Sequence, residues 1–376
     1  MYLYTMVIGN LKKLSMGIVS LFALAAFAGG GLCACNSNVQ DAEAKAVVNS
    51  IEFAETDPLL GEPFKVYPLQ GKYRATLIQY PSDSSRTYKG IVLYVHGYND
   101  YYFNRELAQK ADSAGYGFFA IDLHFYGRSL RSDDEPFRAR EIQEYFPEID
   151  SALVMAQRLS RTLMTSSDPS KTLLPEYLIG HSTGGLIVSL YADSRRHGQD
   201  FAAIVLNSPF LEMNLQWFAR NVLVPVASAI GSMIPDFPVN DLPNPNYSYS
   251  LRKGYRGEWE YDTRLKPPVS PMKDLGWIRA IHRAHTQVQK GLNLETPILL
   301  MHSDCSTRDK DWTEEYMHCD GVLDVDNMKK YGRQLGPRVT LDEIQGGLHD
   351  LYLSAKEARE KAYRKTFEFF DKHSSL

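Results

Sequence analysis

The sequence predicts an α/β fold built on a doubly wound, mostly parallel sheet. Short apolar runs that stop at polar residues alternate with segments of helical periodicity, a pattern typical of buried strands linked by helices. Polar residues follow several of these runs, and in such sheets the active groups lie beyond the carboxyl ends of the strands. The 376 residues, 44% hydrophobic and 23% charged, suit one large domain with an insertion or two domains.

The elements follow one another as the fold requires. An alternating run at residues 72–80 predicts an edge strand. Continuous apolar runs predict buried strands at residues 91–95, 118–122, 176–180, 202–206 and 297–302, with a last strand at 339–344. Apolar residues at helical spacing predict helices at residues 102–114 and 141–164, after residue 182, and at 355–371. The predicted core therefore comprises residues 61–210 and 291–376.

Residues 211–290 interrupt the alternation between the sixth and seventh core strands. They are rich in aromatic residues and prolines, and a structureless loop of this length is improbable inside a compact domain. We therefore predict a mobile cap over the site. The alternative is a surface insertion without contact to a substrate.

The motif Gly180-His181-Ser182-Thr183-Gly184 joins an apolar run to a helix-compatible run. A serine in a sharp strand-to-helix turn presents its hydroxyl clear of the backbone, and the glycines permit close approach of strand and helix. The helix N-terminus supplies N–H groups where an oxyanion forms. This context predicts that Ser182 is a nucleophile. The alternative is a chance match in a Ser/Gly-rich loop.

A serine nucleophile requires a general base, and His349 is the best candidate. It follows the last strand after two glycines, and the order nucleophile, acid, histidine is typical of this fold. His181 is fixed beside the nucleophile, and His96 belongs to a loop that supplies an oxyanion donor. Three further candidates are His124, His302 and His318.

Two carboxylates compete for the role of orienting acid. Asp304 directly follows the strand at 297–302, whereas Asp320 lies in a turn before a helix that Asp324 can cap. In an exported chain, Cys305 and Cys319 can close a loop of about 15 residues, which would return Asp320 to the strand end. The alternative is two free thiols. We favour Asp320 and keep Asp304 as the other possibility.

The predicted oxyanion donors are backbone N–H groups. One belongs to Thr183, directly after the nucleophile, and the other to Tyr98, directly after His96-Gly97. Each such donor contributes roughly 3–4 kcal/mol to transition-state stabilisation.

The N-terminus has the pattern of an export signal. Lys12 and Lys13 precede an apolar stretch that ends in glycines. Leu32-Cys33-Ala34-Cys35 resembles a bacterial lipobox, which implies cleavage before Cys35 and lipid attachment there. We therefore expect a signal peptide at residues 1–34, a tether at 35–60, and an exported, membrane-anchored bacterial lipoprotein. Plain secretion and an uncleaved membrane anchor are the alternatives.

Residues 72–373 resemble the α/β-hydrolase superfamily, in particular its monoacylglycerol lipase and serine aminopeptidase-like (lysophospholipase-type) branch. The family's Gly-x-x-Asp after the strand at 297–302 is replaced by a sequence beginning His302-Ser303-Asp304. The resemblance implies ester hydrolysis through an acyl-enzyme, without a metal or organic cofactor. The matching motifs are Val95-His96-Gly97, Asp122 to Ser129, Gly180 to Gly185, Asp320 to Asp324 and Gly347-Leu348-His349.

These features favour a serine hydrolase of monoacylglycerol, lysophospholipid or similar lipid esters. A serine aminopeptidase is the alternative, and it would need an acidic cap residue such as Glu258 or Glu260 to bind the substrate amine. A third possibility is a binding protein that kept the fold. The net charge of −4 gives no indication of a nucleic-acid surface.

Overall fold

A computed structural model describes residues 54–83, 86–160, 173–195, 201–239, 244–271, 273–308 and 311–374. The predicted signal peptide, Cys35 and residues 36–53 of the predicted tether lie outside these ranges. Residues 54–60, which we assigned to the tether, are part of the folded structure. Glu55 and Thr56 form a short strand, and Asp57 is buried beside Arg128.

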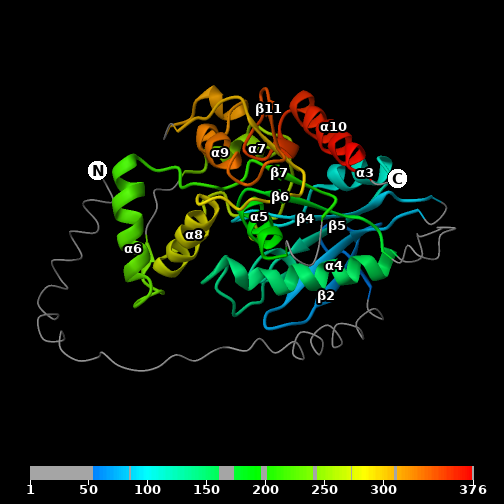
Figure 1. Cartoon of the computed structure of the whole chain (residues 1–376), viewed down its shortest axis with the longest axis horizontal. Coiled ribbons are helices and arrows are strands. Elements are labelled where there is room, and N and C mark those ends of the chain that lie inside the picture. The colour runs from blue at the N-terminus through cyan, green and yellow to red at the C-terminus, as the bar shows by residue number, and fades with distance from the viewer. Residues whose placement is uncertain are drawn as a thin grey trace, which may run out of the picture.

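Nine strands form one twisted sheet, which lies among the helices at the centre of the molecule (Figure 1). Their spatial order is β1-β2-β3-β5-β4-β6-β7-β10-β11. The strands are β1 (Glu55–Thr56), β2 (Lys65–Leu69), β3 (Ala75–Tyr80), β4 (Gly90–Val95), β5 (Tyr116–Asp122), β6 (Glu176–His181), β7 (Ala203–Asn207), β10 (Ile298–Ser303) and β11 (Val339–Ile344).

The sheet is parallel from β5 to β11 and antiparallel at its N-terminal side. The prediction of an edge strand at residues 72–80 was wrong, because β3 pairs with β2 on one side and β5 on the other. The strand that covers its outer side, β2, contains Pro68. Proline has no N–H to donate to a neighbouring strand and interrupts the usual strand pattern. The sequence of β2 therefore did not predict a strand.

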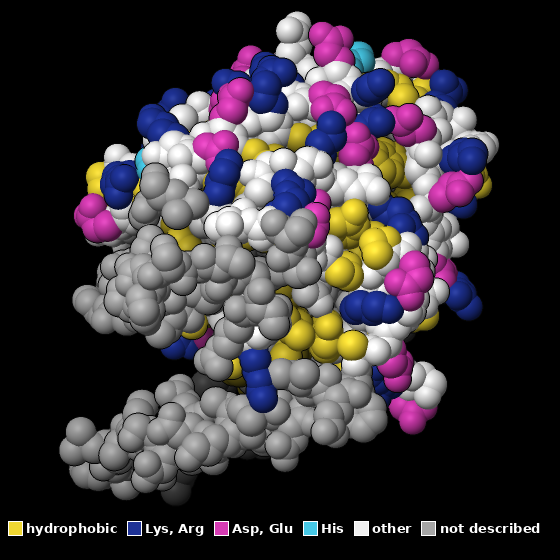
Figure 2. Space-filling model, turned by 90° about the vertical axis from the view of Figure 1, so that its right-hand side faces the viewer, with side chains coloured by type: hydrophobic (Ala, Val, Ile, Leu, Met, Phe, Trp, Pro, Cys, Tyr) yellow, Lys and Arg dark blue, Asp and Glu magenta, His cyan; other side chains and the backbone are white. Residues whose placement is uncertain are grey.

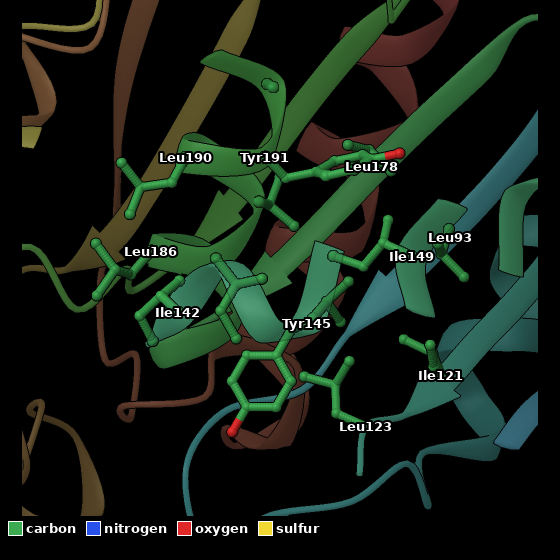
Figure 3. Close-up of a cluster of buried hydrophobic side chains, with 14 of the residues drawn as sticks. Leu93, Ile121, Leu123, Ile142, Tyr145, Ile149, Leu178, Leu186, Leu190 and Tyr191 are labelled. Carbon is green, nitrogen blue, oxygen red and sulfur yellow. The ribbon is translucent and has the colours of Figure 1, made fainter. Parts of the chain in front are cut away.

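Helices cover both faces of the sheet because side chains alternate along each strand. In β4, Ile91 and Leu93 join one apolar cluster, whereas Val92 joins the other. The first cluster includes α4 (Phe146–Ser160), the short helix η3 (Ile142–Tyr145) and α5 (Thr183–Arg195), and Figure 3 shows these helices packing on strand residues. The second includes α3 (Arg105–Ser113) and α10 (Lys356–Lys372).

The insertion lies between β7 and β10, the sixth and seventh strands of five or more residues. Its last helix, α8, places Trp277 and Ile281 in the same apolar cluster as α5. This end of the insertion is therefore attached to the core. The insertion contains η5 (Ala219–Leu223), α6 (Val224–Ile230), β8 (Pro238–Val239), α7 (Asn246–Leu251), β9 (Lys273–Asp274) and α8 (Leu275–Val288).

Arg128 ties the start of the described chain to the core. Its guanidinium bonds the Asp57 carboxylate at 2.7 Å and the Asp122 carboxylate at 2.8 Å. All three side chains are almost fully buried, so each charge depends on its partners.

The described surface carries both signs of charge. On the face in Figure 2, Lys and Arg side chains are interspersed with Asp and Glu.

Within the described ranges, none of the helices has the length and apolar character needed to cross a membrane.

Candidate active site

A cavity of about 790 Å³ lies at the carboxyl edge of the sheet, between the core and the insertion. Ser182 and Thr183 reach it from the turn between β6 and α5, His349 from the segment after β11, and Tyr98 from the loop after β4. The insertion contributes α7, β9 and α8 residues to the same cavity. The structure therefore brings four of the predicted site residues together.

Ser182 sits in a strained turn whose backbone is held on both sides. Its φ angle is +52°, a left-handed value that non-glycine residues rarely adopt. The Ser182 N–H donates to the carbonyl of Asn207 at 3.0 Å, and its carbonyl accepts from the N–H of Phe210 at 2.9 Å. A Cβ at Gly97 would lie 2.9 Å from the Ser182 Cβ, so a glycine is needed there.

Asp320 and His349 form a buried pair behind the cavity. His349 Nδ1 donates to Asp320 Oδ2 at 2.9 Å, which leaves Nε2 as the nitrogen that can accept a proton. The other carboxylate oxygen of Asp320 accepts from the N–H groups of Val322 and Leu323 at 2.8 Å each. These bonds fix the carboxylate and, through it, the orientation of the imidazole.

Asp304, the alternative acid, lies elsewhere. Its carboxylate accepts from the Gly346 N–H at 2.9 Å and faces a separate polar cavity of about 470 Å³ that His349 does not line. Two of the alternative bases have other partners: His124 pairs with Glu148, and His302 Nδ1 bonds the Ser303 carbonyl. The geometry thus gives His349 the Asp320 carboxylate as its partner.

A disulfide joins Cys305 to Cys319 and closes the loop that separates β10 from Asp320. Two backbone bonds reinforce this closure: the Asp320 N–H donates to the Cys305 carbonyl, and the Thr307 N–H donates to the Asp320 carbonyl, both at 2.9 Å. Asp320 is therefore held next to the end of β10 despite the intervening residues.

The predicted oxyanion donors occupy positions suited to that task. Thr183 is the first residue of α5, and the first N–H groups of a helix have no intrahelical acceptor. Tyr98 belongs to the loop after β4. The centre of its ring lies 5.0 Å from that of Trp277 and 5.6 Å from that of Phe137. His96 anchors the start of this loop, because its Nε2 accepts from the Leu123 N–H at 3.1 Å.

A buried ion pair among the residues that line this cavity was not predicted. Lys266, in the insertion, donates from Nζ to Asp100 Oδ1 at 2.7 Å, and both residues are buried. Burial alone would raise the pKa of Asp100, but the Lys266 ammonium lowers it. Burial opposes the charge of Lys266, yet Asp100 raises the pKa of the ammonium. Both groups therefore stay ionised. The two residues are 166 positions apart, and no local pattern connects them.

The nearby carboxylate of Asp350 is also held in place. Its Oδ1 accepts from the Asn207 side chain at 2.7 Å, and its N–H donates to the Tyr247 hydroxyl at 3.1 Å. Asp100, His181 and Asp350 place possible ligand atoms within 4.8 Å of one another. Because the Lys266 ammonium already neutralises Asp100, this donor set does not fit a metal ion.

A parallel sheet, a serine in a strained strand-to-helix turn and a buried Asp–His pair after later strands together define an α/β hydrolase. More specifically, the chain belongs to the family described as serine aminopeptidase, S33, whose model matches residues 86–353.

Three individual proteins that the chain is similar to are monoacylglycerol or monoglyceride lipases. The chain is 29% identical over 155 residues to a monoacylglycerol lipase of Mycolicibacterium smegmatis, an alignment that covers 41% of this chain and about half (49%) of that relative. A soluble variant of the Saccharomyces cerevisiae monoglyceride lipase shares the fold, with a TM-score of 0.61, 14% identity, and coverage of 86% of this chain and 99% of that one. The Paleococcus ferrophilus monoacylglycerol lipase also shares the fold, with a TM-score of 0.54 and 20% identity. That match covers 79% of this chain and 98% of the other.

Proposed function

We propose that this protein is a serine hydrolase that cleaves carboxylic esters of lipids through an acyl-enzyme. The observation that carries the proposal is the buried Asp320–His349 pair, whose imidazole lines the same cavity as Ser182. The Ser182 Oγ attacks the ester carbonyl carbon while His349 Nε2 accepts its proton. The imidazolium then protonates the departing alkoxide, which leaves as the alcohol and gives the acyl-Ser182 ester.

Water completes the cycle. His349 takes a proton from the water, whose oxygen attacks the acyl carbon, and returns that proton to Ser182 as the carboxylic acid leaves. The N–H groups of Tyr98 and Thr183 bind the oxyanion in both tetrahedral intermediates. Asp320 keeps the imidazole in the correct tautomer and stabilises the imidazolium without being protonated itself.

The cavity suits an ester with an apolar acyl group. Aromatic and aliphatic side chains line much of it, namely Tyr98, Phe210, Tyr247, Leu251, Val269, Trp277 and Leu323. Its volume of about 790 Å³ is within the usual range for small-molecule sites. The named relatives that act on monoacylglycerols support the same class. We therefore propose monoacylglycerols, lysophospholipids or similar lipid esters as substrates.

The family description favours a serine aminopeptidase as the second candidate. That activity needs a carboxylate to bind the substrate amine. Glu258 pairs with Arg359, Glu260 pairs with Lys253, and neither glutamate lines the cavity. Asp100 is the one carboxylate among the described lining residues, and Lys266 neutralises it. The electrostatics of the cavity therefore favour an ester.

We also propose that Cys35 carries a lipid that anchors the exported protein to a membrane. The lipobox-like sequence supports this location. The disulfide also supports export, because disulfides persist in oxidising compartments.

One assay tests the proposed reaction. The purified protein is labelled with a fluorophosphonate and then offered acyl esters of increasing chain length beside aminoacyl-naphthylamides. We expect labelling at Ser182 and turnover of the esters. Ser182→Ala should lose both, with turnover falling by a factor on the order of a million, while its melting curve stays close to that of the wild type. Hydrolysis of the naphthylamides but not the esters would establish the aminopeptidase instead.

A further inference from the structure

The loop that carries Tyr98 joins β4 to α3 and is bonded to the core near both of its ends. His96 is bonded to Leu123, as described above, and the Tyr102 N–H donates to Asp122 Oδ1 at 2.9 Å. Beyond Gly97, the chain enters a left-handed conformation at Asn99, whose φ is +53°. A loop of this shape needs external bonds to keep one conformation.

Those bonds come from the insertion. The Asn99 side-chain amide donates to the carbonyl of Pro267 at 3.0 Å and to the Ser270 hydroxyl at 3.2 Å. The Tyr101 hydroxyl accepts from the N–H of Asp262 at 2.8 Å. Asp100, which lies between these two residues, bonds Lys266. Three consecutive residues of the loop are thus bonded to the segment 262–270.

The ion pair is the strongest of these attachments. Its charges are shielded from water, and a charge-assisted hydrogen bond is strongest in such a low-dielectric environment. The Lys266 ammonium also lies 5.8 Å from the ring centre of Phe103 and 5.9 Å from that of Tyr261, so two aromatic faces stabilise its charge. The exposed pair Lys253–Glu260, also 2.7 Å long, lies in the same insertion and is screened by solvent.

We propose that Lys266 is a positioning residue for the reaction. It holds Asp100, and through Asp100 it fixes the N–H of Tyr98 where the oxyanion forms. The inference rests on the proposed ester hydrolysis. It links the cap to catalysis, because a displacement of segment 262–270 displaces an oxyanion donor with it.

The test compares Lys266→Met with the wild type on 4-nitrophenyl butyrate. A misplaced donor weakens the stabilisation of the transition state but not the binding of the substrate. The kcat should therefore fall about 10- to 100-fold, with KM nearly unchanged. Inhibition by phenylboronic acid, which forms a tetrahedral adduct with a nucleophilic serine, should weaken by the same factor as kcat/KM. Lys266→Arg, which keeps the charge, should recover much of kcat, and the surface control Lys253→Met should match the wild type.

Lys266→Met leaves a buried carboxylate unpaired and can fail to fold for that reason alone. The double variant Asp100→Asn/Lys266→Met removes both charges and should melt close to the wild type. We expect its kcat to stay low, because the attachment is still missing. Recovery of kcat together with the melting temperature would overturn the inference, as would a raised KM with unchanged kcat. A wild type without ester turnover would instead overturn the proposed function, and this inference with it.

Discussion

The N–H of Asp320 donates to the carbonyl oxygen of Cys305 at 2.9 Å. Because Cys305 is also disulfide-bonded to Cys319, the residue before Asp320 and Asp320 itself are both attached to the chain directly after β10. The segment between Cys305 and Cys319 therefore begins and ends at the same point. This closure places a carboxylate that is distant from the strand in sequence beside the strand end.

The choice of acid gives the first prediction. Asp320→Asn should lower turnover of a short-chain ester by up to about ten-thousandfold, because an amide no longer favours the correct imidazole tautomer. Asp304→Asn is the matched control: an asparagine oxygen can still accept from the Gly346 N–H, so its turnover should stay close to that of the wild type. Low turnover in Asp304→Asn together with near-wild-type turnover in Asp320→Asn would contradict the assignment of Asp320 as the acid.

The disulfide gives the second prediction. Cys305→Ser/Cys319→Ser should lower the free energy of unfolding by roughly 3 kcal/mol, through the greater entropy of the open loop in the unfolded chain. Turnover should also fall at temperatures where the variant is folded, because Asp320 is less firmly placed. Urea unfolding and ester turnover measure the two effects separately. Two reactive thiols in denatured, exported wild-type protein would contradict the bond itself.

The third prediction concerns the acid sensitivity of helix α8 in the insertion. His285 is buried there, and its Nε2 donates to the Phe210 carbonyl at 2.9 Å. Burial lowers the pKa of His285 to about 3. The unfolded chain, with a histidine pKa of about 6.5, therefore binds the proton first as the pH falls. This histidine contributes stability above pH 6.5 that is lost progressively between pH 6.5 and 3.

The variant that tests it is His285→Gln, whose side-chain amide can still donate to Phe210 but does not titrate. Urea unfolding of both proteins at pH 7.5 and 5.0 isolates the contribution of this residue. The wild type should lose up to about 2 kcal/mol more than the variant over that interval. Equal losses would show that the pKa of His285 is not lowered in the folded protein.

The fourth prediction concerns the N-terminus. In a bacterial host the mature protein should begin at Cys35, carry acyl chains and partition into detergent. Intact mass spectrometry measures the cleavage site and the modification together. Cys35→Ser should abolish lipidation, whereas the neighbouring control Cys33→Ser should be processed normally. Cleavage at another position, or an unmodified Cys35, would exclude the lipoprotein.

The parallel part of the sheet could be predicted because its strands are buried on both faces. The run from Ile91 to Val95, for example, serves two apolar clusters and is therefore apolar throughout. The turn at Ser182 was predictable for a different reason, since Gly180 lies against the backbone of Gly184 and Gly185, only a few residues further along the chain. Local constraints of this kind leave a local pattern in the sequence.

The contacts between the cap and the core left no such pattern. Lys266 and Asp100, or Tyr247 and Asp350, meet only after the chain has folded, and nothing in either local sequence requires the partner. The acid was an intermediate case. Spacing left Asp304 and Asp320 both open, and only the folded path of residues 305–320 shows which of them reaches His349.

The buried guanidinium of Arg128 sets how far the N-terminus can be trimmed. A shortened protein that starts at residue 54 keeps both Asp57 and Asp122 around this charge. A cut beyond Asp57 removes one of the two carboxylates from a site that solvent scarcely reaches, at a cost of about 3–5 kcal/mol. The part of the chain that must be kept therefore begins no later than Asp57. A form of the protein without its proposed anchor can be made by deletion up to residue 53, with both carboxylates around Arg128 kept.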